Sequence, residues 1–153
     1  MNFTKIYGTG QFLCLESFFV TEKISFESIE NILIFNIMKQ QSHRICIFLN
    51  RPVFYELRSA SFFNKIFFSL YKLFNGNSLE IKIELEEKDL AIFFQVIEAN
   101  LPDARIPDTA NSLLWRTIDG GFKIPRVKLI YSKSNSGLAE TLKKYQMLIT
   151  ESQ

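Results

Sequence analysis

The chain has 153 residues, the length of one ordinary domain, of which 47% are hydrophobic and 22% are charged. This composition excludes a disordered chain, and its sixteen phenylalanines supply large side chains for a core or for a partner surface. The formal net charge of +2 is too small to indicate a polyanionic partner by itself.

The N-terminal stretch is punctuated by Gly8 and Gly10, and "QFLCLESFFVTE" at 11–22 then predicts one long strand or two short ones. Cys14 and Cys46 each lie inside an apolar run, which predicts buried thiols rather than a disulfide framework. The chain starts without a signal-peptide pattern, and no stretch approaches the roughly 18 apolar residues that span a bilayer. We therefore expect a soluble, reducing, cytoplasmic protein.

The next stretch, "KISFESIENILIFNIMKQQSHRICIFLN" at 23–50, allows two interpretations. Apolar residues from Phe26 to Ile37 recur at helical spacing, which would give a helix over 26–39. Isoleucines dominate both sides of the polar run "QQSH" at 40–43, which favours two strands joined by a turn. We adopt the strands and keep the helix as the alternative.

The middle of the chain predicts a strand, "PVFYELRS", with Pro52 at its first position, followed by a Phe-rich helix over 61–74. Ser61 is the expected N-terminal cap of that helix, and Asn75-Gly76 is its expected stop.

Strict alternation in "NSLEIKIELEE" predicts a strand with one wet face and one core face. "EKDLAIFFQVIEANLPD" predicts a helix that ends at Asn100 and packs through Leu90, Phe93, Phe94 and Ile97. The acidic residues at the junction suit the start of a helix, whose dipole favours negative charge. They are Glu84, Glu86, Glu87 and Asp89.

The C-terminal third predicts a short helix in "DTANSLLWRTI" at 108–118, a turn at 119–121, a strand in "PRVKLIY" at 125–131 and a last helix over 137–149. We expect a single compact unit, with a β-rich domain over 1–103 and an extension over 104–153 packed on it.

The order of these elements resembles the bacterial pleckstrin-homology-like (PH-like) domains over about residues 6–103. The likeness lies in "GTGQFLCLESFFVTEKISFESIENI" and "LEIKIELEEKDLAIFFQVIEANLP", which are similar to the early strands and to the last strand with its capping helix. The resemblance implies an α+β fold, an antiparallel, partly open β-barrel or sheet with a capping helix. The Phe-rich helix would be an insertion, and a strand and helix would extend the C-terminus. It also implies binding or assembly rather than catalysis.

Catalytic groups are scarce in this sequence. The only histidine, His43, falls in a predicted turn, where we expect a solvated side chain, and no cysteine or carboxylate stands at metal-ligand spacing from it. We therefore expect no metal, no cofactor and no enzyme. A small enzyme of unknown reaction, built from scattered carboxylates and tyrosines, is the remaining alternative.

The Phe-rich helix is the main functional candidate, because only a narrow polar stripe interrupts its apolar surface. The excess apolar surface could be buried against the C-terminal segment, could bind a protein partner or a second copy, or could enter a membrane interface. The candidate partner- or membrane-binding residues are Phe63, Lys65, Phe67, Phe68, Tyr71 and Lys72.

Charge is segregated along the chain, with eight acidic and three basic residues in 78–108, and one acidic and six basic residues in 122–145. The two segments could face each other or remain solvated. Alternatively, Lys123, Arg126 and Lys128 could bind an anionic lipid surface, which would place the protein peripherally at the inner membrane surface. Nucleic acid is the less favoured partner.

Overall fold

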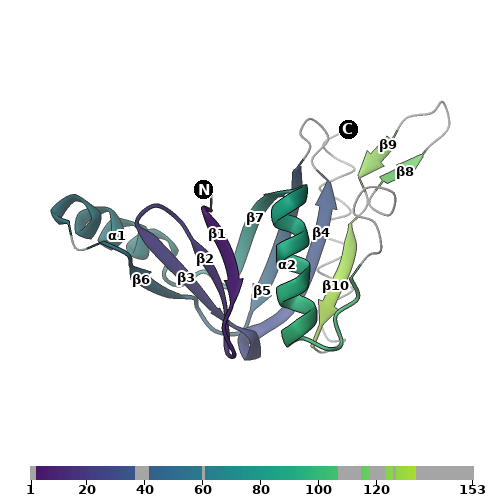
Figure 1. Cartoon of the computed structure of the whole chain (residues 1–153), viewed down its shortest axis with the longest axis horizontal. Coiled ribbons are helices and arrows are strands. Elements are labelled where there is room, and N and C mark those ends of the chain that lie inside the picture. Colours follow the sequence, from purple (N-terminus) through teal and green to yellow (C-terminus); the bar gives the residue numbers. More distant parts are fainter. Residues whose placement is uncertain are drawn as a thin grey trace.

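The computed structural model describes residues 3–36, 42–59, 61–106, 115–117, 123–125 and 127–133. These residues form two four-stranded antiparallel sheets, a two-stranded ribbon and two α-helices (Figure 1). Within these ranges the two larger sheets do not join into one closed barrel. The α+β class expected from the sequence is confirmed.

The first sheet has the strand order β1-β2-β3-β6. β1, β2 and β3 form a meander, and β6 returns to pair with β3, with Leu57 opposite Val20. The segment expected to hold one long or two short strands therefore holds β2 and the start of β3. The strands of this sheet are β1 (Lys5–Gly8), β2 (Phe12–Glu16), β3 (Val20–Ser25) and β6 (Phe54–Leu57).

The second sheet has the strand order β10-β4-β5-β7, and a 3-10 turn, η1 (Phe26–Ser28), leads into it from β3. The strand interpretation is confirmed for Ile29–Asn36 and Ser42–Leu49, while residues 37–41 lie outside the described ranges. β10 comes from the C-terminal part of the chain, which thus contributes a strand to this sheet. Its strands are β4 (Ile29–Asn36), β5 (Ser42–Leu49), β7 (Glu80–Glu86) and β10 (Lys128–Ser132).

Burial follows two patterns in the second sheet. β7 alternates, with Ile81, Ile83 and Leu85 buried and the two residues between them exposed, as its sequence predicts. Leu79, expected on the same buried face, precedes the strand and is exposed. β4 is flanked by β10 and β5 and is buried on both faces. Ile34 belongs to the main core, whereas its neighbour Leu33 packs with Cys46 in a second, smaller cluster.

The helix α2 (Glu87–Asn100) begins directly after β7 and contacts both β1 and β7. Figure 1 shows it lying beside β1 and across the second sheet. Its apolar stripe is buried, and its first turn carries Glu87 and Asp89, where the helix dipole favours acidic side chains. The predicted helix, its buried face of Leu90, Phe93, Phe94 and Ile97, and its end at Asn100 are all confirmed.

The close packing of α2 on β1 depends on a glycine. A Cβ placed on Gly8 would lie 2.8 Å from Cγ1 of Val96, a stiff β-branched side chain on α2. We therefore expect Gly8→Ala to lower the free energy of unfolding by about 1–3 kcal/mol through overpacking, measured by urea denaturation.

Two variants control that prediction. Gly10→Ala should leave stability nearly unchanged, because no side chain or backbone atom lies within 4 Å of the added Cβ. Adding Val96→Ala to Gly8→Ala should recover part of the loss, since the clash is then removed. Equal costs for the two glycine substitutions would show that α2 does not press on β1.

The ribbon corrects one expectation. β8 (Trp115–Thr117) and β9 (Lys123–Pro125) pair antiparallel, so the short helix expected over 108–118 is wrong at 115–117. Pairing with β9 satisfies the backbone of this stretch, and Trp and Thr suit a strand. The rest of 108–118, the turn expected at 119–121 and the helix expected over 137–149 lie outside the described residues.

Candidate functional site

The helix α1 (Phe62–Asn75) lies between β6 and β7 in the chain and at one end of the molecule (Figure 1). The Ser61 hydroxyl accepts a hydrogen bond from the Asn64 N–H at 3.3 Å, and the Gly76 N–H donates to the Lys72 carbonyl at 2.8 Å. The predicted cap and stop are thus confirmed. No residue of α1 is fully buried, which separates it sharply from α2.

One face of α1 rests on the first sheet. At about 100° per residue, Asn64, Phe68, Tyr71 and Asn75 share this face, and all four are half-buried. The ring of Phe19, from the turn between β2 and β3, lies 5.8 Å from that of Tyr71. This contact face carries two asparagines, so it is not the most apolar side of the helix.

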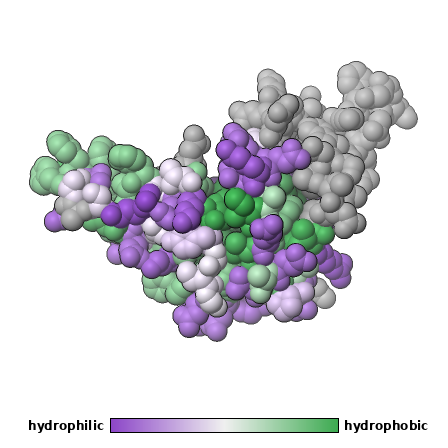
Figure 2. Space-filling view, viewed as in Figure 1, coloured by the Kyte–Doolittle hydropathy of each residue, from purple (hydrophilic) through white to green (hydrophobic). Residues whose placement is uncertain are grey.

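The apolar face of α1 points away from the sheet. Its members fall within an arc of about 140°, and their exposed fractions run from 42% to 81%. Only at the edge of this arc does the face meet the first sheet, where the Phe67 ring lies 6.2 Å from that of Phe19. Figure 2 shows this helix as a largely apolar lobe at the left end of the molecule. A helix normally turns this kind of face toward a core. The apolar face of α1 consists of Phe62, Phe63, Ile66, Phe67, Leu70, Leu73 and Phe74.

Positive charge borders this face. Lys65, Ser69 and Lys72 form the polar stripe of α1, and all three are exposed. From Leu57 to Leu79 the chain carries Arg58 and these two lysines but no acidic residue. Within this segment, the charged side chains that accompany the apolar face of α1 are therefore all basic.

The candidate binding residues separate into groups. Phe63, Lys65, Phe67 and Lys72 are exposed, while Phe68 and Tyr71 are half-buried and turn toward the sheet. Lys128 is half-buried in β10, Lys123 lies in β9, and Arg126 lies outside the described residues. Of these candidates, only the four exposed residues of α1 reach solvent on one helix, with Phe63 and Phe67 on its apolar face and Lys65 and Lys72 on its polar stripe.

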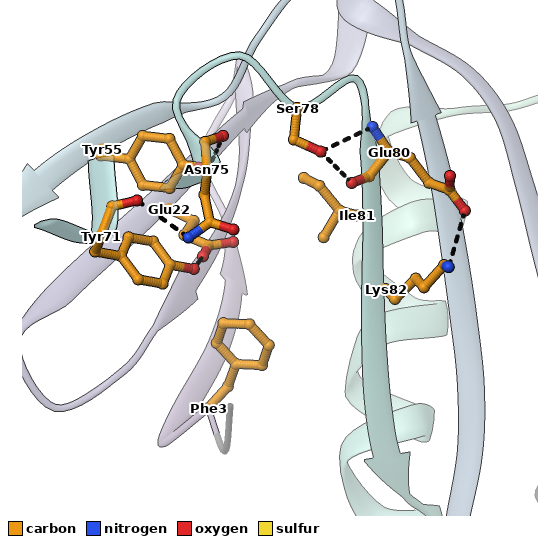
Figure 3. Close-up of a pocket in the computed structure, with 9 residues that line it drawn as sticks. All are labelled: Phe3, Glu22, Tyr55, Tyr71, Asn75, Ser78, Glu80, Ile81 and Lys82. Atoms are coloured by element: carbon orange, nitrogen blue, oxygen red, sulfur yellow. Dashed lines mark hydrogen bonds and ion pairs between the residues drawn. The ribbon is translucent and has the colours of Figure 1, made fainter. Parts of the chain in front are cut away.

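A cavity of about 250 Å³ lies where α1, the first sheet and β7 meet (Figure 3). We call it the Glu22 pocket, after the carboxylate in its wall, which is only 3% exposed. The Tyr71 hydroxyl donates a hydrogen bond to Glu22 Oε1, and the Tyr55 hydroxyl donates to the Asn75 carbonyl at 3.1 Å. The two tyrosine rings stand nearly perpendicular, with centroids 5.4 Å apart.

The groups of this pocket titrate away from their ordinary ranges. Burial raises the pKa of the Glu22 carboxyl, and the hydrogen bond from Tyr71 and then the charge of the N-terminal amino group oppose that rise only in part. Burial and then the charge of Glu22 raise the pKa of Tyr55 to about 12. Burial and the hydrogen bond to Glu22 also raise the pKa of Tyr71. Both phenols therefore remain protonated hydrogen-bond donors at neutral pH.

Sequence reasoning missed Glu22 and Tyr55. The signal for Glu22 was present, because Val20, Glu22 and Ile24 alternate along β3 and therefore point to the same side of the sheet. An acidic residue at a core-facing position of such a pattern indicates a paired or functional side chain. Tyr55 carried no such local signal.

Other candidate groups are placed differently from expectation. His43 is 3% exposed and lies in β5 opposite Leu85, so the expected solvated turn position is wrong. Cys14 and Cys46 are buried and form no disulfide, as predicted, and burial raises the pKa of the Cys14 thiol. The residues described contain no cluster of three His, Cys, Asp or Glu side chains that could hold a metal ion.

Neither α1 nor α2, the helices in the described part of the chain, is long and apolar enough to cross a membrane. Comparisons of this chain with models of protein families, with curated proteins and with solved structures found no match.

Proposed function

We propose that this chain is a non-enzymatic interaction module with a PH-like architecture, which self-associates through the apolar face of α1. The observation that carries the proposal is the orientation of α1, whose most apolar side faces solvent. The order of strands and the direct passage from β7 into α2 support the PH-like part. The burial of the lone histidine and of both thiols supports a role other than catalysis.

A second copy is the occupant that the size of this surface favours. Phe62, Phe63, Phe67 and Phe74 are 54% to 81% exposed, and together they leave roughly 500 Å² of apolar surface in water. With the three aliphatic residues, the face approaches the roughly 800 Å² that each partner contributes to a standard interface. A single patch that meets its own copy across a two-fold axis forms a closed dimer.

Sedimentation equilibrium of the full chain tests this proposal. We expect the mass to rise from monomer to dimer between micromolar and millimolar concentrations, without further growth, because a two-fold contact closes on itself. A monomer throughout that range would overturn self-association. A series of oligomers larger than the dimer would indicate head-to-tail contact between copies instead.

The basic border of the apolar face favours a second candidate, a peripheral module that binds anionic membranes. Aromatic side chains flanked by lysines suit the interface of a bilayer. We expect binding to anionic liposomes to weaken as salt rises, and Lys65→Gln with Lys72→Gln to reduce it about tenfold or more. Liposome co-sedimentation measures both effects.

The same lysine variant separates the two candidates. It should leave dimerisation nearly unchanged, because both lysines lie on the polar stripe beside the apolar face. Liposome binding that does not depend on salt or on lipid charge would count against the membrane candidate. Loss of the dimer in the lysine variant would show that the interface extends beyond the apolar face.

A further inference from the structure

The Glu22 pocket offers a second site, and its chemistry does not depend on self-association. Aromatic rings of Phe3, Tyr55 and Tyr71 line it together with the Glu22 carboxylate. Figure 3 shows Ile81 pointing from β7 toward these groups, while the side chains of Glu80 and Lys82 turn to the other side of that strand. Its volume of about 250 Å³ falls below the roughly 300 Å³ at which drug-sized pockets begin, so the occupant must be small.

The hydroxyl and amide groups in the wall each donate to a partner within the chain. The Tyr71 hydroxyl donates to Glu22, and the Tyr55 hydroxyl donates to the Asn75 carbonyl. The Asn75 amide donates to the Tyr71 carbonyl at 3.0 Å, and the Ser78 hydroxyl donates to the Glu80 carbonyl at 2.7 Å. Beside its aromatic faces the wall holds the buried Glu22 carboxylate, which accepts hydrogen bonds and cannot donate them, so an occupant that donates to it is favoured.

We propose that the Glu22 pocket binds an alkylammonium group. The ammonium would donate to the Glu22 carboxylate and lie against the rings of Tyr55 and Tyr71, while its alkyl chain would contact Ile81 and Phe3. Aromatic rings around a carboxylate form the environment in which proteins hold organic cations. A free amine and a lysine side chain of a peptide share this chemistry.

The charged groups that face the site set its pH dependence. Glu22 comes from β3, Tyr55 from β6 and Tyr71 from α1, while Glu80 and Lys82 of β7 pair with each other at 3.6 Å. The N-terminal amino group also acts on Glu22 and lowers its pKa, but burial outweighs it. The carboxylate is therefore costly to ionise, and a further cation in the pocket would favour its charged form. Affinity should rise as pH rises through that pKa and fall again as the amine loses its proton near pH ~10.4.

The test uses the full chain with its isoleucine δ-methyl groups labelled for NMR, since Ile81 lines the pocket. We expect n-butylammonium to shift the Ile81 methyl signal saturably, while the signals of Ile34 and Ile45, buried elsewhere in the core, stay in place. The neutral isostere n-butanol should cause no saturable shift. Absence of a saturable shift with n-butylammonium, or equal binding of n-butanol, would overturn the proposal.

Matched variants assign the binding to the carboxylate. Glu22→Gln keeps the shape of the side chain but removes its charge. It should weaken the binding of n-butylammonium by about tenfold or more. Glu98→Gln, on an exposed position of α2, should bind as the native chain does. If Glu22→Gln does not fold, Tyr55→Leu provides the second test, because it removes an aromatic face and should also weaken binding. Unchanged affinity in a folded variant would overturn the site.

Two further probes distinguish the source of the ammonium group. Putrescine represents a free amine, and a lysine with both its α-amino and α-carboxyl groups blocked represents a peptide side chain. Tighter binding of putrescine assigns the pocket to free amines, and tighter binding of the blocked lysine assigns it to a peptide. If neither displaces n-butylammonium, both proposed sources of the ammonium group are wrong.

Discussion

Ile34→Lys is expected to unfold the protein at room temperature. Ile34 is fully buried in the main core, on a strand flanked by β10 and β5, with Ile45 opposite it on β5. Removing the isoleucine costs about 2–5 kcal/mol, and an unpaired ammonium in its place adds several kcal/mol of lost hydration. That total is comparable to the whole stability of an ordinary domain, which is about 5–15 kcal/mol.

Circular dichroism with urea titration measures this effect. Ile34→Val provides the conservative comparison and should cost only about 0.5–1.5 kcal/mol. Glu98→Lys places the same new charge on an exposed position of α2 and should change stability by less than about 0.5 kcal/mol. A folded Ile34→Lys chain with the native urea midpoint would contradict the position of β4 in the core.

The ambiguity of this segment in the sequence has a physical origin. An edge or surface strand shows alternation because one of its faces is wet, as Ile81, Ile83 and Leu85 show in β7. β4 is buried on both faces, so Leu33 and Ile34 are both apolar although they point to opposite sides. A continuous apolar run of this kind can be assigned only by its β-branched residues and by its partners.

Local sequence patterns were sufficient to predict the structure where residues close together in the chain determine it. Ser61 capped α1 as predicted, and the stripe from Leu90 to Ile97 identified the buried face of α2. They failed for His43, because its burial is set by the register between β5 and β7, which brings Leu85 opposite it from distant sequence. They failed in the same way at 115–117, whose strand depends on β9.

The candidate site was predicted only in part for the same reason. The sequence marks α1 as apolar over most of its surface, but it does not say which side meets the sheet. Glu22 and Tyr55 decide that, since Glu22 engages Tyr71 from the distant strand β3 and Tyr55 engages Asn75 from β6, just before the helix. The result turns Phe68 and Tyr71 inward and leaves Phe63 outward.

Phe63→Glu combined with Phe74→Glu is expected to abolish dimerisation. The two rings are 71% and 81% exposed at opposite ends of the apolar face of α1, so a second copy would cover both. Aromatic side chains that become fully buried in an interface contribute about 2 kcal/mol or more each. Losing two of them should weaken the dimer about a thousandfold or more, and the paired carboxylates would repel their copies.

This double variant should remain folded, because neither ring lies on the side of α1 that meets Phe19 and Tyr55. Its urea midpoint, measured at a concentration where the native chain is monomeric, should match that of the native chain. Sedimentation equilibrium then gives the answer directly: a monomer at every concentration places the contact on the apolar face of α1. A dimer of native affinity would show that the interface lies elsewhere on the chain. The apolar face of α1 would then be assigned to membrane binding, and the same double variant should lose its binding to liposomes.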